Sequence, residues 1–233
     1  LLDLPDDRQH RSKHRRPFAA GRLPLLHGLL AAPLLLATAF AVAATINTGF
    51  MAVLAGYYLL TLAYSLALKR MPTVDVMTLA GLYTLRIIAG AAATGIAASF
   101  WLLAFSMFLF LSLSVAKRYA EMLAVKQSAR LAASGRGYHV DDLPLLRSLG
   151  VSSGHAAVLL LAFYVNSPES QMLYRHPHLI WLLCPLLLYW ISRVWMKTHR
   201  GLMHDDPLVF ALKDDVSRAI ALIGLAVLVA AAL

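Results

Sequence analysis

The stretch AASFWLLAFSMFLFLSLSVA, residues 97–116, decides the class of fold to which this chain belongs. It contains no charged residue over 20 positions, and a helix needs about 20 mostly apolar residues to cross the hydrocarbon core of a bilayer. Its apolar residues form a continuous block instead of recurring on one helical face, which is typical of a segment surrounded by lipid. Because backbone groups in lipid must be satisfied within their own segment, we predict a transmembrane helix here.

Similar apolar blocks recur along the whole chain of 233 residues. Hydrophobic residues make up 60% of it and charged residues only 14%, whereas a soluble domain usually has about 25% charged residues. We predict seven spans, at residues 27–45, 51–68, 74–95, 97–116, 151–166, 178–196 and 216–233. The sequence therefore predicts an all-α fold, a polytopic transmembrane helical bundle that forms one domain over residues 1–233.

The basic residues predict the orientation of this bundle. Of 21 Lys and Arg residues, all but Arg175 and Arg86 fall in loops on one side of the predicted spans. These loops are residues 1–24, 69–70, 117–150 and 193–218. By the positive-inside rule, they face the cytoplasm of a bacterial cell whose inner membrane holds the protein. A net charge of +9 is common in nucleic-acid-binding proteins, but basic residues confined to loops between spans favour a membrane protein without a nucleic-acid partner.

The segment DLPDDRQHRSKHRRPFAAG, residues 3–21, suggests half of a binding site. Asp3 and Asp7 are four residues apart and would share one face of a helical turn. Close carboxylates are the oxygen ligands that Mg²⁺ prefers before a substrate phosphate bridges to it. Three of the basic residues that follow could grip phosphate oxygens: Arg8, Lys13 and Arg16. The alternative is a solvated loop whose positive charge contacts anionic lipid.

Two further features of the spans bear on function. Arg86 lies 11 residues after Asp75, about 16 Å along a helix. Since a charge at that depth is costly, we expect Arg86 to face the interior of the bundle and to have an anionic partner. Asp75, Thr78, Leu82 and Arg86 share one helical stripe that could line a cavity.

The N-terminal string resembles the first motif of the UbiA prenyltransferase superfamily of intramembrane transferases. Asp3 and Asp7 match the last two acids of that motif, and its preceding Asn-Asp pair would fall before residue 1. The chain is therefore expected to be N-terminally truncated, with seven spans present of about nine. YSLALKRMPTVDVMTLAGLYTLRIIAGA (64–91) and AKRYAE (116–121) are most similar to bacterial decaprenyl-phosphate phosphoribosyltransferases.

One departure from the family pattern narrows the predicted chemistry. Typical prenyltransferases of the superfamily carry a second Asp-rich motif after the fourth helix of this chain, where this sequence has VAKRYAEMLAVK. That segment holds a single acid, Glu121, among basic residues. One acid cluster with a basic partner suits one diphosphate and a second anion, such as a lipid phosphate.

The residues and the resemblance together assign roles to twelve positions. The predicted catalytic residues are Asp3, Asp7, Lys69, Tyr119 and Glu121, with Asp3 and Asp7 as the Mg²⁺ ligands. The predicted substrate-binding residues are Arg8, Lys13, Arg16, Tyr64, Arg86, Lys117 and Arg118. Among these, Lys117, Arg118 and Tyr119 are the candidates to hold a lipid phosphate.

The resemblance implies a Mg²⁺-dependent membrane transferase that displaces diphosphate from its donor and uses a polyprenyl lipid. The favoured reaction is phosphoribosyl transfer from phosphoribosyl pyrophosphate to polyprenyl phosphate. Prenyl transfer from a polyprenyl diphosphate to an aromatic acceptor is the alternative. A lipid-binding or transport protein without chemistry is the alternative of another class, and association with further copies of the chain stays open.

Overall fold

The structure is a computed structural model that describes residues 4, 8, 13–127, 137–203 and 206–233. Seven of its helices are long and apolar enough to cross a membrane. They are built from α2 (Leu25–Ile46), α3 (Thr48–Leu66), α4 (Val74–Thr94), α5 (Phe100–Gln127), α6 (Leu143–Val165), α8 (Leu183–His199) and α10 (Asp215–Ala232). The shorter helices are η1 (Lys13–Arg15), η2 (Leu68–Arg70), η3 (Val140–Asp142), α7 (Pro168–Leu173), η4 (Pro177–Leu182) and α9 (Pro207–Lys213). The predicted all-α, seven-span bundle is confirmed.

Two predicted spans differ clearly from the helices that contain them. The helix α5 continues to Gln127, well beyond the predicted end at residue 116, because the charged residues that follow are good helix formers outside the hydrocarbon core. The helix α6 starts at Leu143 instead of residue 151. Asp142 occupies its N-cap position, and its side chain accepts a hydrogen bond from the backbone N–H of His139 (2.8 Å).

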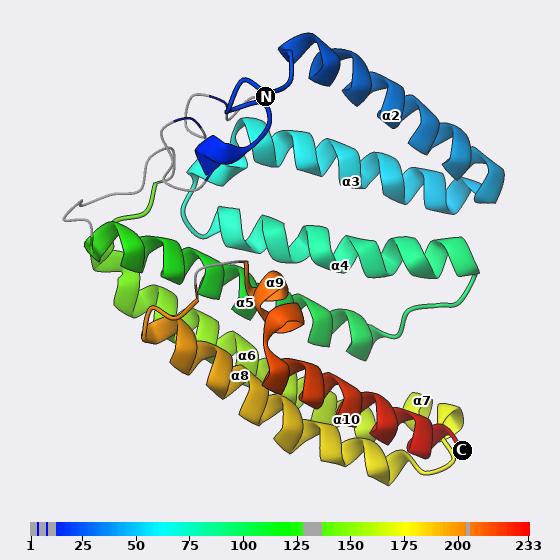
Figure 1. Cartoon of the computed structure of the whole chain (residues 1–233). Helices are drawn as coiled ribbons and strands as arrows, with labels where there is room; N and C mark the ends of the chain where they lie inside the picture. Colours follow the sequence, from blue (N-terminus) through cyan, green and yellow to red (C-terminus); the bar gives the residue numbers. More distant parts are fainter. Residues whose placement is uncertain (1–3, 5–7, 9–12, 128–136, 204–205) are drawn as a thin grey trace.

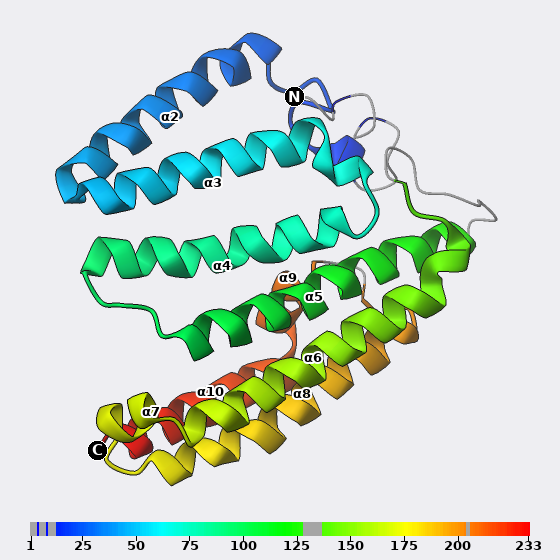
Figure 2. The same ribbon diagram turned by 180° about the vertical axis from the view of Figure 1, so that it is seen from behind.

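The long helices lie side by side and alternate in direction, so that their connections gather at the two ends of the bundle (Figure 1). We call one of them the charged end. There α4 and α6 begin and α3, α5 and α8 finish, on the left in Figure 1, and the first turn of α10 is directed toward this end from below α9. The N-terminal segment lies at this end, and the C-terminus lies at the opposite one (Figures 1 and 2).

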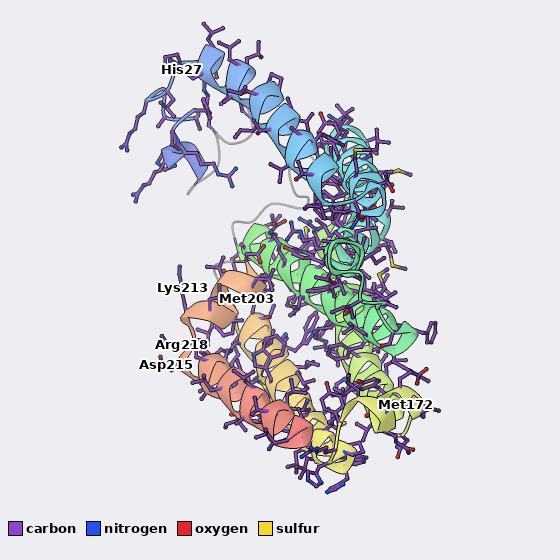
Figure 3. The ribbon with its side chains drawn as sticks, turned by 90° about the vertical axis from the view of Figure 1, so that its right-hand side faces the viewer. His27, Met172, Met203, Lys213, Asp215 and Arg218 are labelled. Carbon is purple, nitrogen blue, oxygen red and sulfur yellow. The ribbon has the colours of Figure 1, made fainter. Side chains whose placement is uncertain are left out.

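The helices form an arc with a concave and a convex side. Seen along the side of the molecule, α2, α3, α4, α5 and then α8 and α10 follow one another around this arc, with α9 on its concave side (Figure 3). The helix α6 packs extensively on α5 at the back (Figure 2). The main buried core lies where α4, α5, α6 and α8 meet, and it includes Val76, Val115, Leu146 and Ile191.

Side-chain hydrogen bonds fix where several helices begin. Asn47 caps α3 by accepting from Phe50 N (2.7 Å), and its amide donates to Ala92 O (2.8 Å) at the end of α4. Asp214 caps α10 and is held by Arg193 and Lys197 of α8, at 2.6 Å and 3.0 Å. The hydrogen bond from the Arg193 guanidinium holds the pKa of Asp214 well below its usual range. These contacts join neighbouring helices at opposite ends of the bundle.

Candidate active site

A buried ion pair joins α4 to α5 at the charged end. Arg118 Nε lies 2.7 Å from Asp75 Oδ2, and its terminal nitrogen donates to Asp75 Oδ1 at 3.2 Å. Both residues are fully buried, with relative exposures of 0%. A buried charge is tolerated only when it is paired and hydrogen-bonded. The contact therefore sets how the first turn of α4 sits against α5.

Two more predicted site residues complete this cluster. The Tyr64 hydroxyl, from the last turn of α3, donates to Asp75 Oδ1 at 2.8 Å. The carboxylate of Glu121, one turn beyond Arg118 on α5, pairs with the guanidinium of Arg118. The structure thus brings together Tyr64, Arg118 and Glu121, and it adds Asp75 as the group that links them. We call these four residues the Asp75 cluster.

The Asp75 cluster bears on the predicted role of Arg118. Its guanidinium is buried between two carboxylates, so its donors are directed at protein oxygens. A ligand phosphate would have to displace one of those carboxylates to reach it. This geometry favours a positioning role for Arg118, in which it holds Glu121 and the α4–α5 contact in place.

Lys117 and Tyr119, on either side of Arg118, face other parts of the protein. Consecutive helical residues point about 100° apart. Lys117 Nζ lies 2.5 Å from Asp206 Oδ2, and these side chains are 38% and 26% exposed. The hydroxyl of Tyr119 and Nδ1 of His199 share a hydrogen bond of 2.8 Å. The three residues predicted to hold one lipid phosphate are therefore not brought together.

Lys117 is the member of this trio that borders the concave side. It lines a crevice of about 30 Å³ between α4, α5 and the start of α9, which also includes Tyr83 and Leu208. Its ion pair with Asp206 is partly exposed, and such pairs contribute little to stability. An incoming phosphate could therefore compete with Asp206 for this ammonium group at small cost.

Arg86 lies away from the Asp75 cluster, in the second half of α4. Its guanidinium donates to the Tyr57 hydroxyl at 2.9 Å and stands 4.9 Å from the centre of the Tyr83 ring. The expected anionic partner is not found for Arg86 within the described residues. A tyrosine hydroxyl and two aromatic faces take its place, which is a recognised way to stabilise a cation away from water.

The N-terminal segment can be placed only in part. Asp3, Asp7 and the side chain of Lys13 lie outside the described residues. Arg8 and Arg16 are exposed, and Lys69 is half-buried in η2 at the charged end. Within the described part of the chain, no three His, Cys, Asp or Glu side chains gather in a way that could hold a metal ion. The assignment of Asp3 and Asp7 as Mg²⁺ ligands therefore stays a prediction. It rests on their carboxylate oxygens, which are the ligands that this ion prefers.

Tyr138 is a further residue of this region that the sequence did not indicate. It is 2% exposed, and its hydroxyl accepts a hydrogen bond from the backbone N–H of Thr73 at 2.9 Å. The Arg118 guanidinium carbon stands 5.9 Å from the centre of its ring. Burial raises the pKa of Tyr138, so its hydroxyl stays protonated. Tyr138 thus bridges the turn before α4 and the Asp75 cluster.

The turn that Tyr138 holds has an unusual backbone. Thr73 adopts φ 67° and ψ −48°, and Val74 N donates to Pro72 O at 2.8 Å across it. These values describe a γ-turn with a positive φ at its centre, a rare and strained conformation for a β-branched residue. Such strain costs about 1–3 kcal/mol and persists only where surrounding contacts hold it.

Removing the Tyr138 hydroxyl tests how tightly this turn is held. We expect Tyr138→Phe to lower the free energy of unfolding by about 0.5–1.5 kcal/mol, because the part-buried hydrogen bond from the backbone N–H of Thr73 loses its acceptor. The measurement is the unfolding midpoint in a mild detergent. Tyr58→Phe is the matched control, since Tyr58 is half-buried and its hydroxyl has no partner among the described residues. Equal midpoints for the two variants would show that the turn does not depend on Tyr138.

Comparison with known proteins identifies the family. A model of the UbiA prenyltransferase family matches residues 1–210. The chain belongs to the UbiA prenyltransferase family. It is 40% identical over 220 residues to the Sinorhizobium fredii protein named "Uncharacterized protein y4nM", covering 93% of this chain and 42% of that protein. The resemblance stated from the N-terminal motif is confirmed.

Two other relatives of this UbiA-family chain have functional names. Nodulation protein NoeC of Azorhizobium caulinodans is 34% identical over 229 residues, covering 97% of this chain and 73% of NoeC. Decaprenyl-phosphate phosphoribosyltransferase of Corynebacterium glutamicum is 36% identical over 123 residues, covering 52% of this chain and 37% of that protein. The chain thus spans less than half the length of two of these three relatives.

Proposed function

We propose that this chain belongs to an intramembrane transferase that displaces diphosphate from a water-soluble donor and uses a polyprenyl lipid. The favoured reaction is phosphoribosyl transfer, in which an oxygen of polyprenyl phosphate attacks the anomeric carbon of phosphoribosyl pyrophosphate. The bond between that carbon and the diphosphate oxygen breaks, and diphosphate leaves with its electron pair. The name of one relative, the decaprenyl-phosphate phosphoribosyltransferase of Corynebacterium glutamicum, supports this choice.

The Asp75 cluster is the observation that carries the proposal. It is a fixed polar network at the charged end, where lipid and a soluble donor can meet, and it includes Arg118 and Glu121 of the KRYAE segment. Buried ionisable groups in spanning helices are costly and usually mark a functional site. Glu121 is about one-third exposed, so this network presents a carboxylate at its edge.

The N-terminal segment supplies the donor side of the proposed site. Asp3 and Asp7 would hold Mg²⁺, which neutralises a diphosphate and stabilises it as a leaving group when bound. Arg8, Lys13 and Arg16 would bind the same diphosphate. Lys117, on the concave side, is the cation best placed to receive the lipid phosphate. We propose that the charged end faces the cytoplasm, following the positive-inside rule.

The test is pyrophosphate release by the whole purified protein in lipid vesicles. We expect release with phosphoribosyl pyrophosphate, polyprenyl phosphate and Mg²⁺, and loss of release with a chelator. Asp3→Asn and Asp7→Asn should each lower the rate by about 100-fold or more, the cost of removing one major electrostatic contact to a transition state. Asp215→Asn is the matched control, an exposed acid at the same end of the bundle.

Three outcomes separate the candidate functions. Release that requires a prenyl diphosphate and an aromatic acid instead would establish the prenyl-transfer alternative. Normal release from either Asp variant would overturn the metal site. Specific binding of polyprenyl phosphate without release from any donor would favour a lipid-binding or transport protein.

A further inference from the structure

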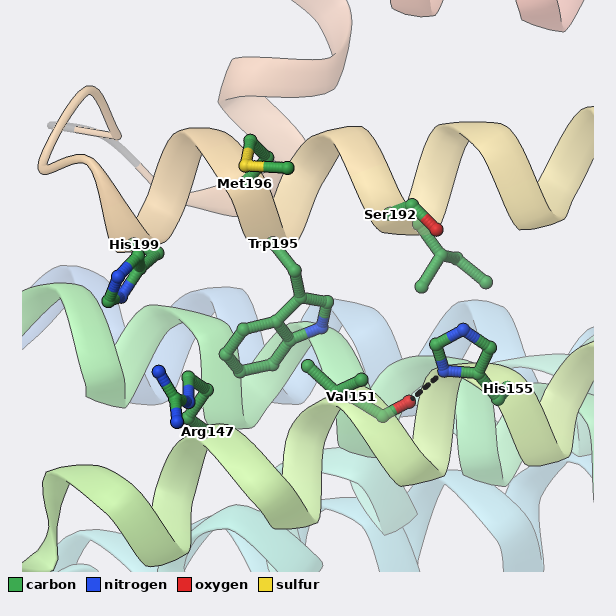
Figure 4. Close-up of a pocket in the computed structure, with 8 residues that line it drawn as sticks. Arg147, Val151, His155, Ser192, Trp195, Met196 and His199 are labelled. Atoms are coloured by element: carbon green, nitrogen blue, oxygen red, sulfur yellow. Dashed lines mark hydrogen bonds between the residues drawn. The ribbon is translucent and has the colours of Figure 1, made fainter.

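A groove runs between α6 and α8 near the charged end (Figure 4). Its volume is about 270 Å³. Figure 1 shows α9 and α10 at the front of the molecule, and Figure 2, from behind, shows α6 in front of them. The groove therefore lies beside α6, apart from the crevice at Lys117 and Asp206 on the concave side.

Small residues of α6 shape the floor of this groove. A Cβ atom at Gly150 would stand 2.0 Å from Cζ2 of Trp195, so only glycine lets the indole sink between the helices. The indole N–H then donates to Ser112 Oγ at 3.0 Å, deep in the core. Ile191 fills the space at Gly154 in the same way. The floor is thus a fixed apolar surface.

The ends of the groove differ in charge. Arg147 and His199 face each other across the end nearest the charged end (Figure 4). Arg147 is exposed and has no carboxylate partner within the described residues. His155 lies eight residues further along α6, about 12 Å deeper, where its Nδ1 bonds to Val151 O at 2.8 Å. The groove therefore has a basic entrance and an apolar length below it.

We propose that this groove binds one anionic membrane phospholipid. The phosphate would lie between Arg147 and His199, and an acyl chain would follow the apolar surface of Val151, Trp195 and Met196. An arginine at the level of the headgroups, with an apolar surface beneath it, is an arrangement that binds anionic lipids. The occupant would come from the surrounding bilayer, because the groove opens on the face away from α9.

Charge argues against a second copy of the chain as the occupant. A two-fold contact would place this face against the same face of the partner. Neither α6 nor α8 contains an Asp or Glu residue, so Arg147 would meet no carboxylate from these helices. A lipid phosphate supplies the negative charge that both helices lack.

The experiment compares lipid binding by the whole purified protein. Phosphatidylglycerol and phosphatidylcholine with identical acyl chains are titrated, and bound lipid is counted by native mass spectrometry. A photoreactive group on the acyl chain of phosphatidylglycerol reports the position. We expect one tightly bound phosphatidylglycerol per chain, labelling of residues 147–155 and 191–199, and weaker binding of phosphatidylcholine.

Two variants act on the two parts of the proposed site. Arg147→Gln should weaken phosphatidylglycerol binding by about fivefold, the contribution of one basic residue near an anionic headgroup. Ser192→Phe should block the acyl position, because Ser192 is exposed and borders the groove. Arg22→Gln is the control, an exposed arginine near the charged end in the segment before α2.

Each other result would overturn the proposal. Equal binding of the two phospholipids, or equal effects of Arg147→Gln and Arg22→Gln, would remove the basis for an anionic headgroup site. Displacement of the label by polyprenyl phosphate at lower concentration than by phosphatidylglycerol would assign the groove to substrate. A change of oligomeric state in Ser192→Phe without loss of lipid would assign it to a contact between copies.

Discussion

Replacing Arg118 with methionine is expected to lower the free energy of unfolding by about 3–5 kcal/mol, the usual cost of breaking a buried ion pair from one side. The carboxylate of Asp75 would stay fully buried, with the Tyr64 hydroxyl as its remaining partner in the Asp75 cluster. Asp75→Asn should cost less, because Arg118 keeps Glu121. The measurement is unfolding in mixed micelles of a mild detergent and dodecyl sulfate.

The double variant Asp75→Asn with Arg118→Met tests whether the pair acts as a unit. We expect it to be less destabilised than the sum of the single variants by about 1–3 kcal/mol, since neither member of the buried pair leaves the charge of the other without its partner. Arg218→Ala is the control, because its ion pair with Asp215 is exposed and should change stability little. Strict additivity in the double variant would contradict the buried contact.

Comparison of Arg118→Lys with Arg118→Met separates a positioning role from a direct one. If Arg118 acts by holding Glu121 and α4, then Arg118→Lys should recover part of the stability and part of the turnover rate together. If the guanidinium instead contacts substrate, the KM for one substrate should rise while stability recovers. These two patterns therefore distinguish the two roles considered for Arg118.

The spans were predictable because the bilayer imposes a simple rule on composition. Continuous apolar blocks of about 20 residues have few alternatives to a spanning helix. The ends of the helices were harder to predict where a helix continues beyond its apolar residues, as at residues 117–127 of α5. This segment contains four charged residues yet is helical, so apolar length alone places the end of the helix too early.

The contacts of the site were less predictable than its residues. The family resemblance directed attention to Tyr64, Arg118 and Glu121, but the partner that links them, Asp75, is 43 residues from Arg118 in the chain. The sequence placed Asp75 on a helical stripe that could line a cavity, but it did not indicate Arg118 as its partner. Tyr138 had no such signal, because its role depends on the strained turn at Thr73, which only the tertiary structure shows.

The packing of α6 on α5 and α8 leads to the second large expected effect. Gly150→Ala would place a methyl group 2.0 Å from Cζ2 and 2.4 Å from Cη2 of Trp195, and 3.0 Å from Val115 Cγ1. The indole cannot move aside without losing its hydrogen bond to Ser112. Because overpacking of a rigid core costs about 1–3 kcal/mol and occasionally more, we expect a loss of about 3 kcal/mol in the free energy of unfolding.

Trp195→Leu should suppress the effect of Gly150→Ala, because it removes the six-membered ring that the new methyl group meets. Alone, Trp195→Leu lowers stability, because it creates a cavity and removes a hydrogen bond. The expected result is therefore that the double variant is about 2 kcal/mol more stable than the sum of the two single effects predicts. Gly224→Ala in α10 is the matched control, since its nearest contacts are at 3.6 Å and 3.7 Å. There alanine fits and favours the helix, so stability should hold or rise slightly. If Gly150→Ala behaved like Gly224→Ala, the insertion of the Trp195 indole between α5 and α6 would be wrong, and the floor of the lipid groove with it.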